Sequence, residues 1–202
     1  NQLLCDSKID ELRLQALLAQ TEGWFVGIKL ALLAYAEDGD KALEGFSGTQ
    51  PELLNYFAHE VINKLAPELR DFVLLTSICT SFNQTLCDAM NTGGRVIQLE
   101  ELSKHELLIT KDHDQANWFR YHPLLQSFLL QRLEIEKGAD YIQSLHLEAA
   151  KGLLSQNRTS LAIQHARQSN DTSFYFETLL TATNEWLKKG EFGPIIDALN
   201  DL

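Results

Sequence analysis

Apolar residues recur at intervals of three and four positions along most of this chain, a spacing that places them on one face of an α-helix. The first two such segments run from Ile9 to Gln20 and from Trp24 to Ala36. They are separated by Thr21-Glu22-Gly23, so we predict two helices joined as a hairpin. The next stretch, from Glu37 to Gln50, is rich in glycine and charged residues, and we interpret it as a linker.

The middle of the chain combines short helical patterns with one strand-like pattern. Helices are predicted at residues 51–65, 67–78, 84–90 and 96–104. Two apolar and aromatic runs, Glu106–Thr110 and Trp118–Tyr121, then enclose a polar turn and predict a β-hairpin. A further helix is predicted from Pro123 to Lys137. Short helices, a two-stranded wing and a closing helix are the layout of a winged-helix domain.

In the tail of the chain, after Gly138, the sequence predicts only helices. Four more helices are predicted there, at residues 141–156, 159–169, 174–189 and 192–202. The apolar pattern around Leu153-Leu154 recurs around Trp186-Leu187, an offset of 33 positions (186 minus 153). A period of about 34 residues is typical of tetratricopeptide-like helical hairpins, and about three of them are needed to bury a continuous core. The predicted fold is therefore mainly α: a helical hairpin, a winged-helix domain with a small β-hairpin, and the start of a tetratricopeptide-like α-solenoid that continues past Leu202.

Composition and charge narrow the possible functions. Of the 202 residues, 45% are hydrophobic and 22% are charged, as in ordinary globular proteins. The formal charge of -11 argues against a nucleic-acid surface, and the segment placed to enter a DNA groove, Arg95–Leu102, has one arginine and two glutamates. The sequence contains no basic-then-apolar leader and no run of about 18 apolar residues. We therefore expect a cytoplasmic protein without a membrane segment, whose three cysteines are reduced.

His122 stands between the predicted second strand and Pro123. Proline suits the first position of a helix, because an N–H group would have no partner there, so His122 falls at or next to the N-cap. Two interpretations of its side chain remain open. It is either a half-buried cap that is hydrogen-bonded to local backbone, or it contacts a phosphate together with the free amides of the helix start, while Arg120 adds positive potential.

No residue pattern typical of a catalytic or metal site is present in the sequence. The six histidines form no zinc-spaced pair, and no cysteine pair assists them. The acidic loop from Asp112 has Ala116 and Pro123 at positions where a calcium loop needs a ligand and a glutamate. The sequence also lacks a Gly-x-Ser-x-Gly elbow and a Gly-x-x-x-x-Gly-Lys-[Ser/Thr] phosphate loop. We expect no catalytic residue, no metal and no bound cofactor within these residues.

Four motifs in a fixed order suggest a family. They are Thr21-Glu22-Gly23-Trp24, Ala66–Phe72 followed by Thr76-Ser77-Ile78, Trp118–Leu125 and Ala162–Ala166. As an ordered set they resemble the large ATP-binding LuxR-type transcriptional regulators, which are STAND-class P-loop ATPases. The resemblance implies that residues 1–48 end a helical domain, 49–137 are the winged helix, and 138–202 start a helical-repeat sensor domain.

The resemblance also implies partners and cofactors beyond these residues. A P-loop domain that binds ATP or ADP would precede Asn1, and a LuxR-type DNA-binding helix-turn-helix would follow Leu202. The full-length protein would be a slow signalling ATPase that self-associates when a small-molecule or protein effector binds the repeat domain. The chain itself would not contact nucleic acid or membrane. The alternative is a helical-repeat interaction scaffold without nucleotide dependence.

The same resemblance nominates one site residue. In STAND proteins the winged helix carries a Met-His-Asp motif, whose histidine touches the β-phosphate of ADP. His122 matches the histidine and becomes the candidate nucleotide-binding residue, whereas Tyr121 and Pro123 stand where Met and Asp would be. Gly23-Trp24-Phe25 similarly resembles a Gly-x-Pro element that approaches the nucleotide, with Phe25 in place of the proline.

Overall fold

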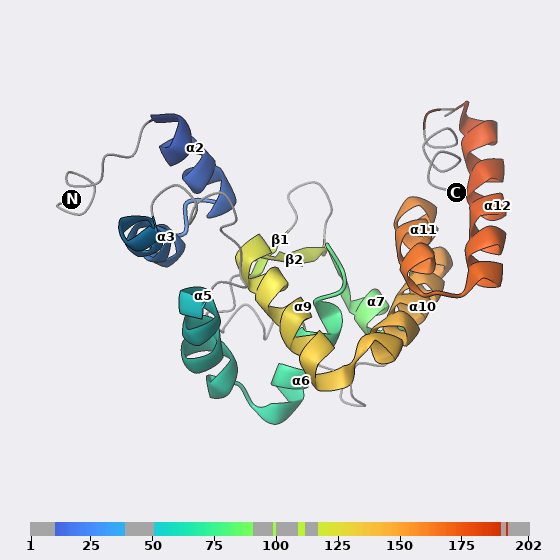
Figure 1. Ribbon diagram of the computed structural model, residues 1–202. Coiled ribbons are helices and arrows are strands. Elements are labelled where there is room, and N and C mark those ends of the chain that lie inside the picture. Colours follow the sequence, from blue (N-terminus) through green and yellow to red (C-terminus); the bar gives the residue numbers. More distant parts are fainter. Residues whose placement is uncertain are drawn as a thin grey trace.

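The computed structural model of the chain describes residues 11–38, 51–90, 99, 109–111, 117–190 and 193. These residues are mainly helical, with one two-stranded sheet in the middle of the chain (Figure 1). The predicted mainly α fold class is thereby confirmed. Four predicted features lie wholly or largely outside the described residues: the helices at 96–104 and 192–202, the linker after Asp38, and the tip of the β-hairpin.

The first two helices form the predicted hairpin. Helix α2 spans Glu11–Gln20 and helix α3 spans Phe25–Asp38. The hydroxyl of Thr21 donates a hydrogen bond to the carbonyl of Leu17 at 2.8 Å, and Thr21 is fully buried. The turn after α2 is therefore anchored by a buried residue, Thr21, while Glu22 and Gly23 are exposed.

The segment predicted as one helix from residue 51 to 65 has three parts. Helix α5 (Pro51–Tyr56) continues into the π-helix η1 (Phe57–Val61) and the 3-10 helix η2 (Ile62–Lys64). A π turn is wider than an α turn, so it brings residues five apart onto one side. Phe57 and Ile62 are five apart, and both are buried. The π turn thus directs both side chains into the core, whereas in a regular α-helix residues five apart would point in different directions.

The central domain continues with two helices and a small sheet. Helices α6 (Pro67–Thr76) and α7 (Gln84–Ala89) precede strands β1 (Ile109–Lys111) and β2 (Phe119–Tyr121), which pair antiparallel. The first strand was predicted to end at Thr110, but Lys111 pairs with Phe119, and its ammonium lies 5.9 Å from the centroid of that ring. Phe82, which lies between the helices predicted at 67–78 and 84–90, also bridges to Phe119.

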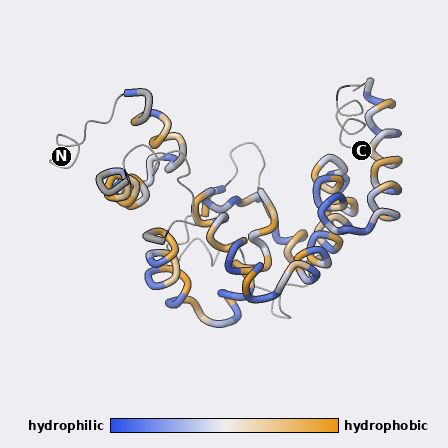
Figure 2. The backbone as a smooth tube through the Cα atoms, in the orientation of Figure 1, coloured by the Kyte–Doolittle hydropathy of each residue, from blue (hydrophilic) through white to orange (hydrophobic). Residues whose placement is uncertain are grey.

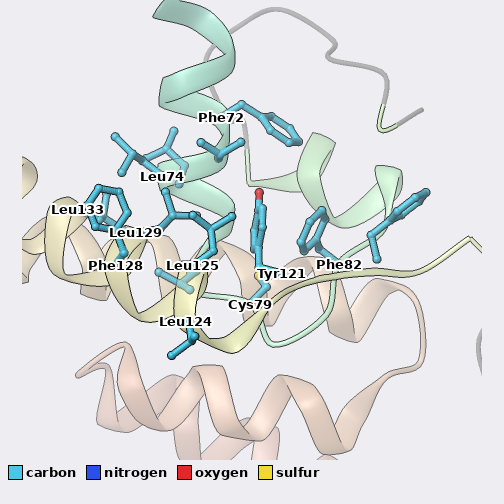
Figure 3. Close-up of a cluster of buried hydrophobic side chains, with 14 of the residues drawn as sticks. Phe72, Leu74, Cys79, Phe82, Tyr121, Leu124, Leu125, Phe128, Leu129 and Leu133 are labelled. Atoms are coloured by element: carbon cyan, nitrogen blue, oxygen red, sulfur yellow. The ribbon is translucent and has the colours of Figure 1, made fainter. Parts of the chain in front are cut away.

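Helix α9 (Pro123–Lys137) closes the core of this central domain. Every helix carries both hydrophobic and hydrophilic residues (Figure 2), and the hydrophobic side of α9 points inward. Most of its buried residues lie on the side of α6 and Tyr121 (Figure 3), whereas Leu124 lies near Gly27 of α3. The buried residues of α9 are Leu124, Leu125, Phe128, Leu129 and Leu133.

Three helices follow α9 with short connections. Only Gly138 separates α9 from α10 (Ala139–Ser155), and its φ of 80° and ψ of 168° are essentially restricted to glycine. The chain bends sharply at this point (Figure 1). Helices α11 (Thr159–Gln168) and α12 (Thr172–Lys189) pack in succession on α10 and α11. A tetratricopeptide-like repeat stays a prediction. No helix in the described ranges is long and apolar enough to cross a membrane.

Candidate functional site

His122 lies where strand β2 ends and helix α9 begins. It is the N-cap residue of α9, with Pro123 in the first helical turn. Its Nδ1 atom accepts a hydrogen bond from the backbone N–H of Leu124 at 3.2 Å. This bond satisfies one of the amide groups that the start of a helix leaves unpaired. The predicted N-cap position of His122 is confirmed.

The other ring nitrogen of His122 contacts a residue 101 positions earlier in the chain. Nε2 lies 2.8 Å from the carbonyl oxygen of Thr21, just after α2. A carbonyl oxygen only accepts, so Nε2 carries the proton, and Nδ1 accepts from Leu124. Both ring nitrogens are thus bonded within the chain, and only 6% of His122 is exposed.

A second polar contact joins the same two segments. Arg120 of β2 donates two hydrogen bonds to the Glu22 carboxylate, from Nη1 to Oε1 at 2.9 Å and from Nη2 to Oε2 at 3.2 Å. A paired geometry of this kind fixes orientation as well as distance. The hydrogen bond from Arg120 lowers the pKa of Glu22 below its ordinary value. The positive charge expected beside His122 is therefore matched by a carboxylate.

Trp24 adds an apolar contact beside these polar ones. Its ring stacks on Phe57, with centroids 5.5 Å apart and planes 9° apart. It also meets Tyr56 edge-on and lies 5.8 Å from the ring of His122. Aromatic pairs of this kind contribute about 0.5–1.5 kcal/mol beyond the area that they bury. Trp24 thus connects the turn after α2 with the junction of α5 and η1 and with the junction of β2 and α9.

We call Thr21, Glu22, Trp24, Arg120 and His122 the hairpin joint, since they fasten the α2–α3 hairpin to the central domain. The structure places two separately predicted elements together here, namely His122 and the turn that contains Gly23-Trp24-Phe25. Phe25 begins α3 and is 75% exposed. A nucleotide contact by His122 or by this turn stays a prediction.

Some residues of this region had no role assigned from the sequence. Thr21 and Glu22 belong to the first of the four family motifs, but only the fold shows that they contact His122 and Arg120. Tyr121 is buried, and its hydroxyl lies 2.7 Å from that of Thr76, which donates to the carbonyl of Phe72. Tyr121 is therefore the donor to Thr76. No local sequence signal could have identified these pairs.

Two cysteines and two histidines are buried outside the hairpin joint in the part of the chain that the structure describes. Cys79 and Cys87 are free and buried, and burial raises the pKa of Cys79 to about 12, so it carries no thiolate at neutral pH. His146 and His165 are buried with their Nδ1 atoms 2.8 Å apart. Burial lowers the pKa of each to about 4, so both rings are neutral. Among the described residues, no three His, Cys, Asp or Glu side chains are grouped so that they could hold a metal ion.

The chain is similar to known regulatory proteins. Residues 58–141 match the family described as the MalT winged helix domain. The chain is 30% identical over 207 residues to the HTH-type transcriptional regulator MalT of Vibrio campbellii, which covers 100% of this chain and 23% of that protein. It is 29% identical over 188 residues to MalT of Klebsiella pneumoniae, covering 89% of this chain and 20% of the relative.

A relative with a different printed activity is also similar. The serine/threonine-protein kinase PknK of Mycobacterium tuberculosis is 32% identical over 161 residues, which cover 78% of this chain and 14% of the kinase. The chain thus spans less than a quarter of the length of each of these relatives.

Proposed function

Because residues 58–141 form a MalT winged helix domain and the chain is MalT-like over most of its length, we propose that it is the regulatory middle segment of an ATP-dependent, inducer-responsive LuxR-type transcriptional activator. The segment couples nucleotide state and effector binding to self-association and to DNA binding by other parts of the protein. It works in the cytoplasm, contributes no catalytic residue and does not contact nucleic acid itself.

The names of the relatives support a role in controlling an activity that lies elsewhere in the protein, and not a role in carrying out that activity. One is named as a kinase and others as HTH-type transcriptional regulators, yet each shares this segment. A segment that accompanies two different outputs is suited to controlling them. The effector is a small molecule or protein that acts on the repeat domain, and the nucleotide, ATP or ADP, binds mainly to a preceding P-loop domain.

The observation that carries the proposal is the hydrogen bond between His122 Nε2 and the Thr21 carbonyl. Nε2 has one proton to donate, so it can serve either Thr21 or a phosphate oxygen, but not both fully. Arg120 is likewise paired with Glu22, so a phosphate at the joint would have to replace a partner of either residue. A nucleotide at the joint therefore alters the attachment of the α2–α3 hairpin and shifts the population between two arrangements.

The test is basal transcription by the full-length protein with His122→Ala. We expect higher inducer-independent transcription and faster loss of bound ADP, because the variant removes the donor at the joint. His59→Ala is the matched control, since His59 is exposed on the same domain. His122→Asn keeps a capping side chain but does not reach Thr21, so it separates capping from the joint. Unchanged basal activity together with unchanged ADP retention would contradict the proposal.

The alternative is an interaction scaffold without nucleotide dependence. It is favoured by the same geometry, because both nitrogens of His122 already have partners within the chain and need no ligand. On this alternative, His122→Ala lowers the stability of the protein but leaves ADP retention and the response to ATP unchanged. Measuring both quantities on the same variant distinguishes the two functions.

A further inference from the structure

A groove lies at the bend where α9 meets α10. Its volume is about 530 Å³, within the range of roughly 300–1,000 Å³ that is usual for small-molecule sites. Three helices line it: α9 contributes Gln131 and Glu134, α10 contributes Gln143 and His146, and α11 contributes Gln168. The groove therefore lies between the central domain and the first helices of the tail, away from the hairpin joint.

The polar lining of the groove consists mainly of carboxamides. In the described ranges, the side chains of Gln131, Gln143 and Gln168 form no hydrogen bond with the protein; the first two are half-buried and Gln168 is exposed, so all three can be reached from solvent. Gln126, half-buried one turn earlier on α9, shows the contrast, because it donates to the carbonyls of both Ser77 and Cys79. A carboxamide is both donor and acceptor, so each groove glutamine can form paired hydrogen bonds with a ligand.

The charge of the lining excludes an anionic ligand. Among the described residues that line it, Glu134 is the one charged side chain, and none is a lysine or arginine. His146 gives no positive charge, because its Nδ1 is hydrogen-bonded to His165 and burial keeps both rings neutral. An anion would meet a carboxylate without any compensating cation from the lining.

The remaining surface of the groove is apolar. Leu130 of α9 and Ile142 of α10 line it and are partly buried against the core. A partly apolar wall with a few hydrogen-bonding groups is the usual composition of a site for a small organic ligand.

From these features we propose that the groove binds a small uncharged molecule that carries adjacent hydroxyl or amide groups. The ligand hydrogen-bonds to Gln131 and Gln143 on opposite sides of the bend at Gly138 and lies against Leu130 and Ile142. Its occupancy ties α9 to α10 across that bend. The site is independent of the nucleotide-dependent switch proposed above, since it shares no residue with the hairpin joint.

Titration of the 202-residue chain, followed by ¹H–¹⁵N NMR spectroscopy, tests the site directly. Sorbitol tests the hydroxyl chemistry and N-acetylglycinamide the amide chemistry, while inorganic phosphate and choline are the charged controls. We expect saturable shifts with at least one neutral compound, confined to residues 130–146 and to Gln168. Groove shifts that only phosphate or choline produces would overturn the proposal, and so would the absence of groove shifts with both neutral compounds.

A double variant, Gln131→Leu with Gln143→Leu, assigns the binding to the carboxamides. Loss of two hydrogen bonds of about 1 kcal/mol each should weaken binding by roughly tenfold or more. The variant should fold, because neither side chain has a partner within the described residues. Gln164→Leu, on the exposed side of α11, is the control and should bind as the parent does. Equal binding by the double variant would overturn the proposal. Should the double variant unfold, the single variants Gln131→Leu and Gln143→Leu decide the same question, because each removes one of the two proposed hydrogen bonds.

Discussion

The central domain is attached to its two neighbours in different ways. On the side of α2 and α3, the hairpin joint uses two polar contacts, from His122 to Thr21 and from Arg120 to Glu22, beside the ring of Trp24. On the side of the tail, α10 lies directly against α7. The first attachment adds two exchangeable polar contacts to the apolar packing of Leu17, Ala31 and Leu32 in the core, whereas the second rests on close packing with one hydrogen bond between side chains.

Helices α7 and α10 approach each other closely at Gly152. A Cβ atom added to Gly152 of α10 would lie 2.8 Å from the Cβ of Ala89 and 3.2 Å from a methyl carbon of Leu86 on α7. Asn83, the N-cap of α7, donates to the Gln156 side chain at 2.7 Å. Only a residue without a side chain allows this approach.

This difference indicates which side can move. The side chains of Arg120 and Glu22 are 40% and 33% exposed, so water can replace their mutual contact at small cost. The α7–α10 contact depends more on the tight approach of Gly152 to Ala89 and Leu86, which water cannot replace. We therefore expect the α2–α3 hairpin to move relative to the central domain, while α10 moves with that domain.

The largest effect is expected from Gly152→Val, which breaks the packed attachment. The new side chain overlaps Ala89 and Leu86, and overpacking of this kind costs about 1–3 kcal/mol. Lys151→Val introduces the same residue at the neighbouring exposed position and controls for helix propensity. Urea unfolding of both variants measures the difference. Equal stability of the two would show that the contact is not tight.

The next effect comes from pH and also concerns the packed side. Burial lowers the pKa of His146 and His165 from 6.5 to about 4, so the folded state resists protonation that the unfolded chain accepts. Stability from this pair is complete above pH 6.5 and falls as the pH drops toward 4. Urea unfolding at pH 7 and pH 5 should show this loss, and His146→Leu with His165→Leu should reduce it. His59→Ala, at an exposed position, should retain the loss, and a double variant with undiminished pH dependence would contradict the assignment.

A smaller effect is expected within the central domain from Tyr121→Phe. The substitution removes the hydrogen bond that Tyr121 donates to Thr76, while Thr76 keeps its own bond to Phe72. The expected cost is about 0.5–1.5 kcal/mol, measured by thermal or urea unfolding. An unchanged midpoint would mean that the buried hydroxyl contributes nothing to the stability of this domain.

The smallest effect on stability is expected at the hairpin joint. A double-mutant cycle with Arg120→Ala and Glu22→Ala should give a coupling energy of about 0.2–1 kcal/mol, because the pair is partly exposed. Since the pKa of Glu22 is lowered in the folded state, this coupling is present above its ordinary pKa of 4.5 and is lost as the pH falls through the lowered value. A coupling as large as the cost of Gly152→Val would contradict the contrast between the two attachments.

Local chemistry predicted much of this structure. Pro123 and the apolar spacing after it located α9 and the cap at His122, and the break at Gly138 separated two helices. The segment from Phe57 to Lys64 was predicted as regular α-helix because hydrophobic spacing does not distinguish α from π turns. The end of the first strand was predicted one residue too early. Lys111 pairs through its backbone, and the polarity of a side chain does not indicate whether its backbone is paired.

The candidate site was predictable only in part. His122 was identified from its own neighbourhood, but its partner Thr21 is 101 positions away and contributes a backbone carbonyl, which every residue has. The sequence likewise showed Arg120 as a positive charge without its partner Glu22. Contacts of this kind depend on how the hairpin packs, and no local pattern encodes them.

Distances between spin labels test the central claim most directly. Labels at Lys29 on α3, Asp71 on α6 and Gln164 on α11 occupy exposed positions on the hairpin, the central domain and the tail. In a variant with His122→Ala and Arg120→Ala, we predict that the Lys29–Asp71 distance distribution broadens while the Asp71–Gln164 distribution stays unchanged. A broadened Asp71–Gln164 distribution with an unchanged Lys29–Asp71 distribution would contradict the account, and so would equal broadening of both.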